Sequence, residues 1–258
     1  ITAAEAVAGV DNITGIGVAT GGSGYGSAPS VSVAAPTARV IATAKVSTTD
    51  NTITVDAGHN MRTGTKLTYT SNGTNLEIAS SSVSDSTALF VINTGSTTTF
   101  KLATSLSNAQ AGTAANITGA GNNSQSFVGD TATATAAVSS GKLSAVTVTG
   151  VGSDYQSIPA VTIAAPAEKT FNAQSAVSTS DDTITISSHG FATGDQLTYS
   201  DKGGTVIAGL TDGGTFFVIR ESANAFKLAT SASNASSGTA VDITAGSSEN
   251  HGVTGTTA

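Results

Sequence analysis

The sequence predicts an all-β protein, a tandem array of small antiparallel β-sandwich or barrel-like modules in two copies of a small-plus-large unit pair. The first observation is an internal duplication. The segments TITIS, HGFATGD, QLTYS, TFFVI, AFKLATS and AVDIT follow one another over 183–244, and related segments run in the same order over 52–118. The second is the alternation of apolar and polar residues in short runs. The third is frequent turn residues, including 29 glycines.

Composition narrows the class of protein further. Charged residues make up only 10 % of the chain and the net charge is −7, without a basic patch that would neutralise phosphates, so we expect no nucleic-acid partner. Apolar runs reach about five residues, far below the roughly 20 that span a bilayer, so we expect no membrane partner. Regular alternation argues against a disordered tract. These features favour a β-rich extracellular or virion protein.

The chain contains no cysteine, which excludes disulfides and thiolate metal sites. Stability must then come from strand pairing, from burial and, we expect, from homo-oligomerisation. The chain also starts in the middle of a pattern and stops where a third copy would begin. We therefore expect a processed product or an excerpt of a longer array.

The first small unit is expected at 1–45. ITGIGVAT alternates as a half-buried strand does, and GGSGYGSAP then breaks the strand through its glycines and proline. VSVAAP is a second alternating strand that a proline closes, and ARVIATAKV leads into the next unit.

The first large unit is expected at 46–130. Its predicted strands are KVSTT, NTITVD, TKLTYTS, LEIAS, ALFVIN, TFKLAT and ANITG. TSNGT carries Asn-Gly between two alternating runs, which predicts a hairpin. SLSNAQAG predicts a helix of one to two turns, with Ser105 as its cap and Gly112 at its end, and the aligned segment 231–238 predicts another.

The plan then restarts, with a second small unit at 131–169 and a second large unit at 170–258. Tyr25 aligns with Tyr155, and the prolines of the first small unit also recur in the second. A unit of about 40 residues is too small to bury a stable core without disulfides. We therefore expect each small unit to pack on its larger neighbour or on another chain.

Alternation also predicts which side chains form the core of each large unit. The predicted core positions are Ile53, Val55, Leu67, Tyr69, Phe90, Ile92, Phe100 and Leu102 in the first, and Ile184, Ile186, Leu197, Tyr199, Phe217, Ile219, Phe226 and Leu228 in the second.

Histidines are the first candidates for chemistry. His59 and His189 occupy matching places before a turn, and His251 lies near the end of the chain. A metal ligand or general base is one interpretation. With no second histidine and no cysteine nearby, we favour a turn residue whose ring bonds a nearby carbonyl.

Acidic residues and the glycine-rich loop are further candidates for chemistry. No acid spacing resembles a Ca²⁺-binding loop, so we expect turn-forming aspartates; the residues concerned are Asp181, Asp182, Asp195, Asp201, Asp212 and Asp242. GGSGYG at 21–26 lacks the lysine and following helix of a phosphate-binding loop and is predicted to connect two strands. Tyr25 and Tyr155 are predicted to pack in the core or between units, with the hydroxyl at the rim.

No motif of a known reaction centre occurs. The nucleophile elbow G-x-S-x-G and the zinc motif H-E-x-x-H are absent. Paired carboxylates that cleave glycosides need only spatial closeness, so the sequence leaves them open. Aromatic residues are only 5 %, with no Trp, which argues against a sugar cleft. We expect no catalytic, cofactor-binding or metal-binding residues, no cofactor and no enzymatic activity.

The repeated segments resemble a known class of modules. GGSGYGSAPSVSVAAP and GVGSDYQSIPAVTIAAP are similar to GGSGY-type modules in structural proteins of tailed phages, notably marine and cyanobacterial ones. The block from HGFATGDQLTYS to AVDIT resembles a β-repeat of tail-fibre, neck or capsid-associated proteins, which also occurs in large bacterial surface proteins. The first half departs at HNMRTGTK, where the second has HGFATGDQ.

This resemblance implies a virion structural protein, forming a fibre, an appendage or a capsid-associated layer. Its expected partners are copies of itself and other virion proteins, with a host surface glycan or receptor as a further candidate. A bacterial cell-surface adhesin or filament subunit is the alternative. A third hypothesis is a depolymerase domain, which requires a cleft with converging carboxylates.

Overall fold

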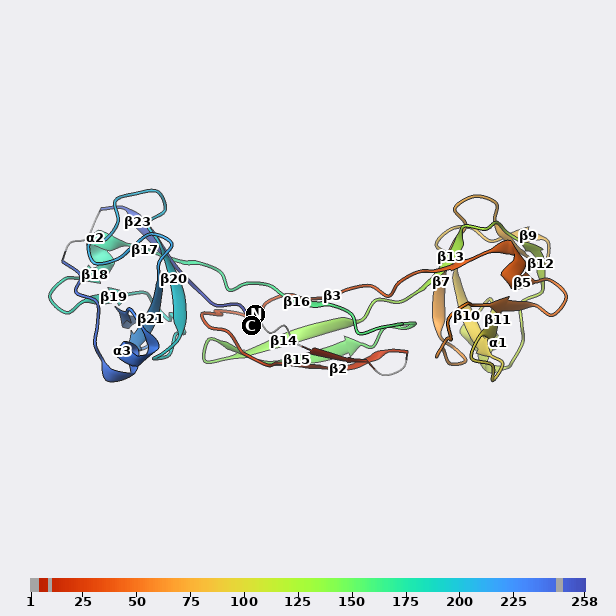
Figure 1. Cartoon of the computed structure of the whole chain (residues 1–258), viewed down its shortest axis with the longest axis horizontal. Coiled ribbons are helices and arrows are strands. Elements are labelled where there is room, and N and C mark those ends of the chain that lie inside the picture. Colours follow the sequence, from red (N-terminus) through yellow and green to blue (C-terminus); the bar gives the residue numbers. More distant parts are fainter. Residues whose placement is uncertain (1–4, 9–10, 245–247) are drawn as a thin grey trace.

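The protein consists of three β modules arranged in a row (Figure 1). The structure, a computed structural model, describes residues 5–8, 11–244 and 248–258. A first end module spans 39–129, a second spans 169–255, and a central module between them combines strands from both halves of the chain. All sheets are antiparallel and one is nearly closed like a barrel, so the predicted all-β class is confirmed.

The first end module contains a seven-stranded sheet and a smaller three-stranded sheet. The large sheet has the order β4-β13-β7-β10-β11-β6-β5, formed by β4 (Arg39–Ile41), β5 (Val46–Ser47), β6 (Thr52–Thr54), β7 (Lys66–Thr70), β10 (Ala88–Asn93), β11 (Thr99–Ala103) and β13 (Gln125–Gly129). The small sheet has the order β12-β8-β9, formed by β8 (Leu76–Ile78), β9 (Ser81–Ser82) and β12 (Ile117–Ala120).

The second end module follows the same path. Its seven-stranded sheet has the order β17-β23-β20-β21-β22-β19-β18, formed by β17 (Lys169–Asn172), β18 (Val177–Ser178), β19 (Thr183–Thr185), β20 (Gln196–Ser200), β21 (Thr215–Arg220), β22 (Ala225–Ala229) and β23 (Asn250–Gly255). In both sheets the first strand along the chain lies beside the last. The segment AVDIT (240–244), which aligns with the strand ANITG, forms no strand.

Most of the core positions predicted from alternation are buried. Leu67 and Tyr69 on β7 are fully buried, as are Leu197 and Tyr199 on β20. Because neighbouring side chains of a strand point to opposite faces, these residues face one core while the residues between them face outward.

The predicted register is wrong on the strand that follows. In β10 the core takes Leu89 and Val91, whereas the predicted Phe90 and Ile92 are only half-buried. In β21 the main core likewise takes Phe216 and Val218, while the predicted Phe217 and Ile219 pack with Ala229 and Ala235 on the other face. A short helix covers that face, so both faces of the strand are apolar and alternation does not identify the core.

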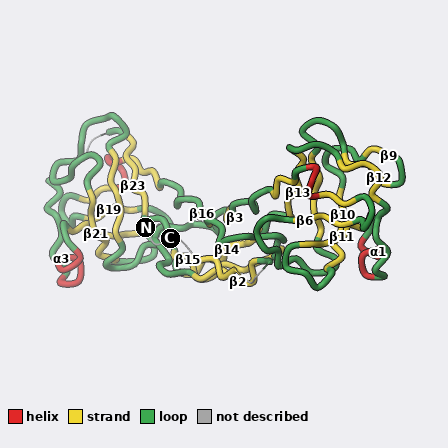
Figure 2. Tube along the Cα trace, turned by 45° about the vertical axis from the view of Figure 1, so that its right-hand side comes forward, coloured by secondary structure: helices red, strands yellow, loops and turns green. Residues whose placement is uncertain are grey.

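These covering helices are the two predicted ones. They are α1 (Leu106–Gln110) and α3 (Ala232–Ser237) (Figure 2). The Ser105 and Ser231 hydroxyls cap them by accepting a hydrogen bond from the backbone N–H of Asn108 and of Asn234, respectively. Gly112 and Gly238 follow the helices in the left-handed conformation. Two further short helices were not predicted: η1 (Thr43–Lys45) and α2 (Ala173–Ala176).

The hairpin predicted at TSNGT does not form. Asn72 and Gly73 do turn the chain with positive φ, but β7 pairs with β10 and β13, whereas β8 pairs with β9 and β12. The Leu76 backbone N–H instead donates to the Tyr69 hydroxyl at 2.7 Å. The turn therefore leads from one sheet to another.

The central module joins strands of both halves. A four-stranded sheet has the order β1-β2-β15-β14, and a two-stranded sheet pairs β16 with β3; the strands are β1 (Glu5–Ala8), β2 (Ile13–Gly17), β3 (Val31–Val33), β14 (Thr133–Ser139), β15 (Lys142–Gly150) and β16 (Val161–Ile163). Val146 pairs with Ile16, and Thr162 pairs with Ser32. Each of these pairs joins positions that align between the two halves of the sequence.

This arrangement corrects the prediction for the small units. They pack mainly on each other within one chain, where their apolar side chains form a shared core. The expected limits also shift, because β4 and β17 belong to the end modules although 39–45 and 169 were assigned to small units. Two units that are each too small for a core thus build one core together.

Candidate functional site

The junctions between the modules hold most of the polar contacts that join distant parts of the chain. At one junction the loop containing Ser23 docks on the second end module. The Ser23 backbone N–H donates to the Thr256 carbonyl at 2.9 Å, and its hydroxyl donates to the Gln196 carbonyl at 3.1 Å. The Thr256 N–H donates back to the Ser23 hydroxyl oxygen at 3.1 Å. The loop is thereby bound to the ends of β20 and β23.

Tyr25 completes this contact. Its backbone N–H donates to the Gly141 carbonyl at 2.9 Å. Its hydroxyl accepts from the Ala258 N–H at 3.1 Å and donates to the Ala164 carbonyl at 3.2 Å. The side chain is only 3 % exposed. Tyr25 packs between units as predicted, but its hydroxyl is internal and bridges two chain segments instead of lying at the rim.

The other junction repeats these contacts on the first end module. The Ser153 N–H donates to the Asp130 carbonyl at 2.9 Å, and its hydroxyl donates to the Lys66 carbonyl at 3.1 Å. The Tyr155 hydroxyl accepts from the Ala132 N–H at 2.8 Å and donates to the Ala34 carbonyl at 3.1 Å. We call the two sets of contacts the clasps: clasp 1 joins 153–155 to the first end module, and clasp 2 joins 23–25 to the second.

Glycines allow the backbones to approach in both clasps. Gly22 and Gly152 have φ of 60° and 64°. A Cβ on Gly152 would lie 2.7 Å from the Ala132 nitrogen and 2.7 Å from the Asp130 carbonyl oxygen, closer than real Cβ contacts. The loop GGSGYG is thus a strand connector as predicted, and its glycines serve backbone docking.

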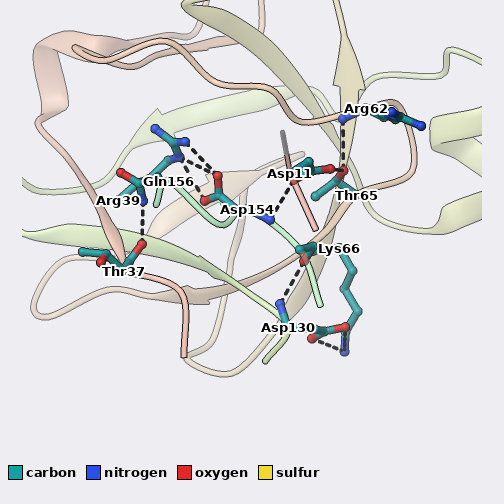
Figure 3. A network of polar contacts seen from close by, with 10 residues as sticks. Asp11, Thr37, Arg39, Arg62, Thr65, Lys66, Asp130, Asp154 and Gln156 are labelled. Carbon is teal, nitrogen blue, oxygen red and sulfur yellow. Dashed lines mark hydrogen bonds and ion pairs between the residues drawn. The ribbon is translucent and has the colours of Figure 1, made fainter. Parts of the chain in front are cut away.

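Clasp 1 also contains a buried ion pair (Figure 3). Arg39 Nε lies 2.8 Å and 2.9 Å from the two carboxylate oxygens of Asp154, and Nη2 lies 2.8 Å from Oδ1. The two side chains are 7 % and 1 % exposed. Burial raises the pKa of the Asp154 carboxyl, and the hydrogen bonds and charge of Arg39 oppose that rise.

Asp11 extends this network towards the end module. Its Oδ1 accepts from the Asp154 N–H at 2.7 Å, and its Oδ2 accepts from the Thr65 hydroxyl at 3.1 Å. Nearer to solvent, Lys66 Nζ lies 3.0 Å from an oxygen of Asp130 (Figure 3). The network therefore connects three parts of the chain: Asp11 between β1 and β2, the loop around Asp154, and the first end module.

Clasp 2 has a different set of charges. Lys142 Nζ lies 2.7 Å from Asp195 Oδ1, and Asp195 Oδ2 accepts from the Ala192 N–H at 2.8 Å. Gly24 stands at the position that aligns with Asp154, so this junction has no counterpart of the buried ion pair. Phe191 packs beside Gly24 instead.

A groove lies at each junction. One of about 460 Å³ is lined by Asp11, Arg62, Lys66 and Asp130 among others. Another of about 450 Å³ contains Phe191 and Arg220. Most charged side chains in the first groove are paired with each other or with backbone groups.

Two of the histidines contact backbone carbonyls, as predicted, and the third contacts a tyrosine hydroxyl. His59 Nε2 lies 3.1 Å from the Thr99 carbonyl oxygen, and His189 Nε2 lies 3.0 Å from that of Ser222. His251 Nδ1 lies 2.6 Å from the Tyr199 hydroxyl. Burial lowers the pKa of His189 and of His251, so both favour the neutral form.

Three aspartates of the second end module bond backbone N–H groups. Asp182 accepts from the Ile243 N–H, Asp201 from the Gly203 N–H, and Asp212 from the Asp201 N–H. Within the described part of the chain, no three His, Cys, Asp or Glu side chains gather as a metal site would require. The Asp201 bond lies within one turn and supports the predicted role at that position, whereas Asp182 and Asp212 bond N–H groups of segments farther along the chain.

Sequence reasoning missed Asp11, Arg39 and Asp154. One signal was present, since Asp154 replaces Gly24 in an otherwise similar loop. Its partner Arg39 lies far away in the sequence, so only the docked modules bring the two charges together.

Comparison with known proteins adds no relative to this description. No family model matches the chain, and no curated protein or solved structure shows significant similarity to it. Among the described residues, no helix has the length and apolarity needed to cross a bilayer. The geometry of the modules and clasps is therefore the basis for a functional proposal.

Proposed function

We propose that this chain is a non-enzymatic structural protein of a tailed-phage virion, where it forms part of a fibre or appendage or of a capsid-associated layer. The sequence resemblance to phage modules motivates the location. The elongated row of three β modules is a shape that suits a spacer or connector (Figure 1).

The observation that carries the proposal is the pair of clasps. Each fixes an end module to the central module through hydrogen bonds of backbone and Ser and Tyr hydroxyl groups. Clasp 1 adds the buried Arg39–Asp154 pair, whose bidentate geometry restricts orientation. A row of modules held in this way resists bending at its joints, which a spacer that keeps its ends at a fixed separation requires and which modules joined only by a mobile linker lack.

The proposal includes a duplication, in which the two halves are copies of one small-plus-large pair. The equal strand order of the two seven-stranded sheets supports it, as do the matching bonds of the two clasps. Antiparallel pairing of aligned positions, such as Ile16 with Val146, is what a two-fold relation between copies produces.

Surface features favour contacts with further protein. β4 is an edge strand of the first end module, and Val40 on it is 65 % exposed. Ile158 in the central region is 62 % exposed. Edge strands with few charges are open to pairing with another chain. Copies of this chain and other virion proteins are the proposed partners, with a host surface glycan or receptor as a further one.

The alternative is a bacterial cell-surface adhesin or extracellular filament subunit. It is favoured by the resemblance of the HGFATGDQLTYS block to repeats of large bacterial surface proteins. The same row of modules would suit a protein on a bacterial cell surface. The location of the protein, on virions or on bacterial cells, therefore distinguishes the two functions.

Three experiments test the proposal. Small-angle X-ray scattering of the purified chain should give a radius of gyration well above the about 18 Å of a compact 258-residue globule. Mass spectrometry and immunogold labelling of purified phage particles should then detect the chain on the virion. A compact particle contradicts the spacer role, and labelling on bacterial cells alone supports the alternative. Release of reducing sugar ends from host polysaccharide by the pure chain would overturn the non-enzymatic assignment.

A further inference from the structure

The two clasps share their backbone bonds but differ at one aligned loop position. This position is Asp154 in clasp 1 and Gly24 in clasp 2. Both residues are buried, and both have a left-handed backbone, with φ of 56° and 77°. Aspartate tolerates this conformation better than most residues do. Backbone geometry alone therefore does not explain why the two loops differ.

The first end module provides a site for the aspartate. Arg39 on β4 binds its carboxylate through two nitrogens, and Asp11 accepts its backbone N–H. Met61 is fully buried in this module, at the position that aligns with Phe191. Nearby, Gln156 Nε2 donates to the Thr37 carbonyl at 2.7 Å.

The second end module leaves no room for such a side chain. A Cβ on Gly24 would lie 2.7 Å from Cε1 of Phe191, which is itself only 2 % exposed. Phe191 contacts His189 and Phe226, with ring centroids 5.6 Å away in each case, so it is held in place. Lys169 aligns with Arg39, and its Nζ lies near Gly26, at 3.5 Å from where a Cβ would stand.

Exchanging the two loops between the end modules would destabilise both junctions. The loop of the second half, placed on its own end module, would bring the Asp154 side chain against Phe191. The loop of the first half, placed on its own end module, would leave the buried Arg39 without the carboxylate that pairs with it. A buried charge that loses its partner is strongly destabilising, and overpacking a filled core is destabilising as well.

We propose that the two loops are selective docking surfaces, each matched to the end module of the opposite half. The loop 152–156 fits a module with arginine and methionine at positions 39 and 61, and the loop 22–26 fits a module with phenylalanine at 191. The partner of each half is therefore a half of the other type. Pairing of two like halves is opposed by clash and by unpaired charge, which makes the association specific.

Substitutions in the full chain test this selectivity at clasp 2. Gly24→Asp should increase amide exchange of the peptide covering Ser23 and Tyr25 by about tenfold or more, because the clash opens the clasp. The peptide covering 153–155 is an internal reference and should exchange at the wild-type rate. Gly26→Ala is the matched control, since its Cβ has room, and it should exchange like wild type.

The rescue separates recognition from simple damage to the loop. Phe191→Met together with Lys169→Arg gives the second end module the side chains of the first. In that background Gly24→Asp should raise exchange at Ser23 and Tyr25 by no more than about threefold. The cost of an aspartate in the left-handed conformation is equal in both backgrounds, so the difference between them measures the fit of the side chain.

The reciprocal cycle applies at clasp 1. Met61→Phe should open clasp 1 by about tenfold when Asp154 is present and much less in the Asp154→Gly/Arg39→Lys background, which gives clasp 1 the aligned side chains of clasp 2 and leaves no arginine unpaired. Selective docking would be overturned if Gly24→Asp had equal effects in the wild-type chain and in the Phe191→Met/Lys169→Arg chain. It would also be overturned if Met61→Phe had equal effects with and without Asp154. Coupling of the expected sign at both clasps would establish it.

Discussion

Val146 lies directly opposite Ile16 across two antiparallel strands of the central sheet, and the two residues occupy aligned positions in the two halves of the sequence. Thr162 and Ser32 stand in the same relation in the two-stranded sheet. Neither small unit has a complete core of its own, and each supplies the missing face of the other. The covalent chain thus joins two small units whose strands pair and whose apolar side chains share one core.

A disulfide tests this pairing. In Ser32→Cys/Thr162→Cys the two sulfurs are directly opposite, and the chain has no other cysteine. We expect an intrachain bond that speeds migration of the monomer on non-reducing gels and raises the free energy of unfolding by about 2–4 kcal/mol. Ser32→Cys alone should stay unbonded. Only intermolecular dimers in the double variant would contradict the pairing within one chain.

The buried ion pair should matter for stability. Asp154→Asn keeps the shape and the left-handed backbone but leaves the charge of Arg39 buried and unpaired, so we expect a loss of about 3–5 kcal/mol in urea unfolding. Lys66→Gln breaks the half-exposed pair with Asp130 and should cost less than about 1 kcal/mol. A smaller effect of Asp154→Asn than of Lys66→Gln is the outcome that this account forbids.

The clasp tyrosines give a further test. Tyr25→Phe and Tyr155→Phe each remove a hydroxyl that bridges an N–H and a carbonyl. Each substitution should cost about 1–3 kcal/mol, because the buried partners are left unsatisfied. Amide exchange should rise at Ala258 in the first variant and at Ala132 in the second. Exchange that rises equally at both sites in either variant would show global destabilisation instead.

Acid should destabilise the second end module. Because burial lowers the pKa of His189 and His251, the unfolded chain takes up protons near pH 6.5 while the folded module does not. The stabilisation is therefore fully present above about pH 6.5 and is lost as pH falls towards the lowered values. Urea midpoints measured from pH 8 to pH 5.5 should decrease, and they should decrease less for His251→Gln.

His251→Gln is a conservative choice, because Gln125 occupies the aligned position in the first half. There Gln125 Oε1 accepts from the Tyr69 hydroxyl at 3.3 Å, as His251 bonds Tyr199. If the urea midpoint of His251→Gln fell with pH as steeply as that of the wild type, protonation of His251 would not contribute to the loss of stability in acid.

Local patterns in the sequence determined much of the fold. Alternation in KLTYT and QLTYS identified Leu67, Tyr69, Leu197 and Tyr199 as core residues. Serine and glycine at the ends of two short segments identified the helices and their caps. These signals are local because side-chain direction and capping depend on a few adjacent residues.

Tertiary structure decided the rest. Phe90 and Phe217 lie on apolar strands whose two faces are both covered, so the choice of face depends on where the helices pack. The Asn72–Gly73 turn has hairpin chemistry, yet the strands around it join different sheets. Arg39 and Asp154 form a pair only because one half of the chain docks on the other. The sequence by itself determined most of the strand segments and the alternation of their side chains, because these properties are local. Which strand meets which, and which charges become neighbours, was decided by long-range packing, because that choice depends on burying surfaces that no single segment contains.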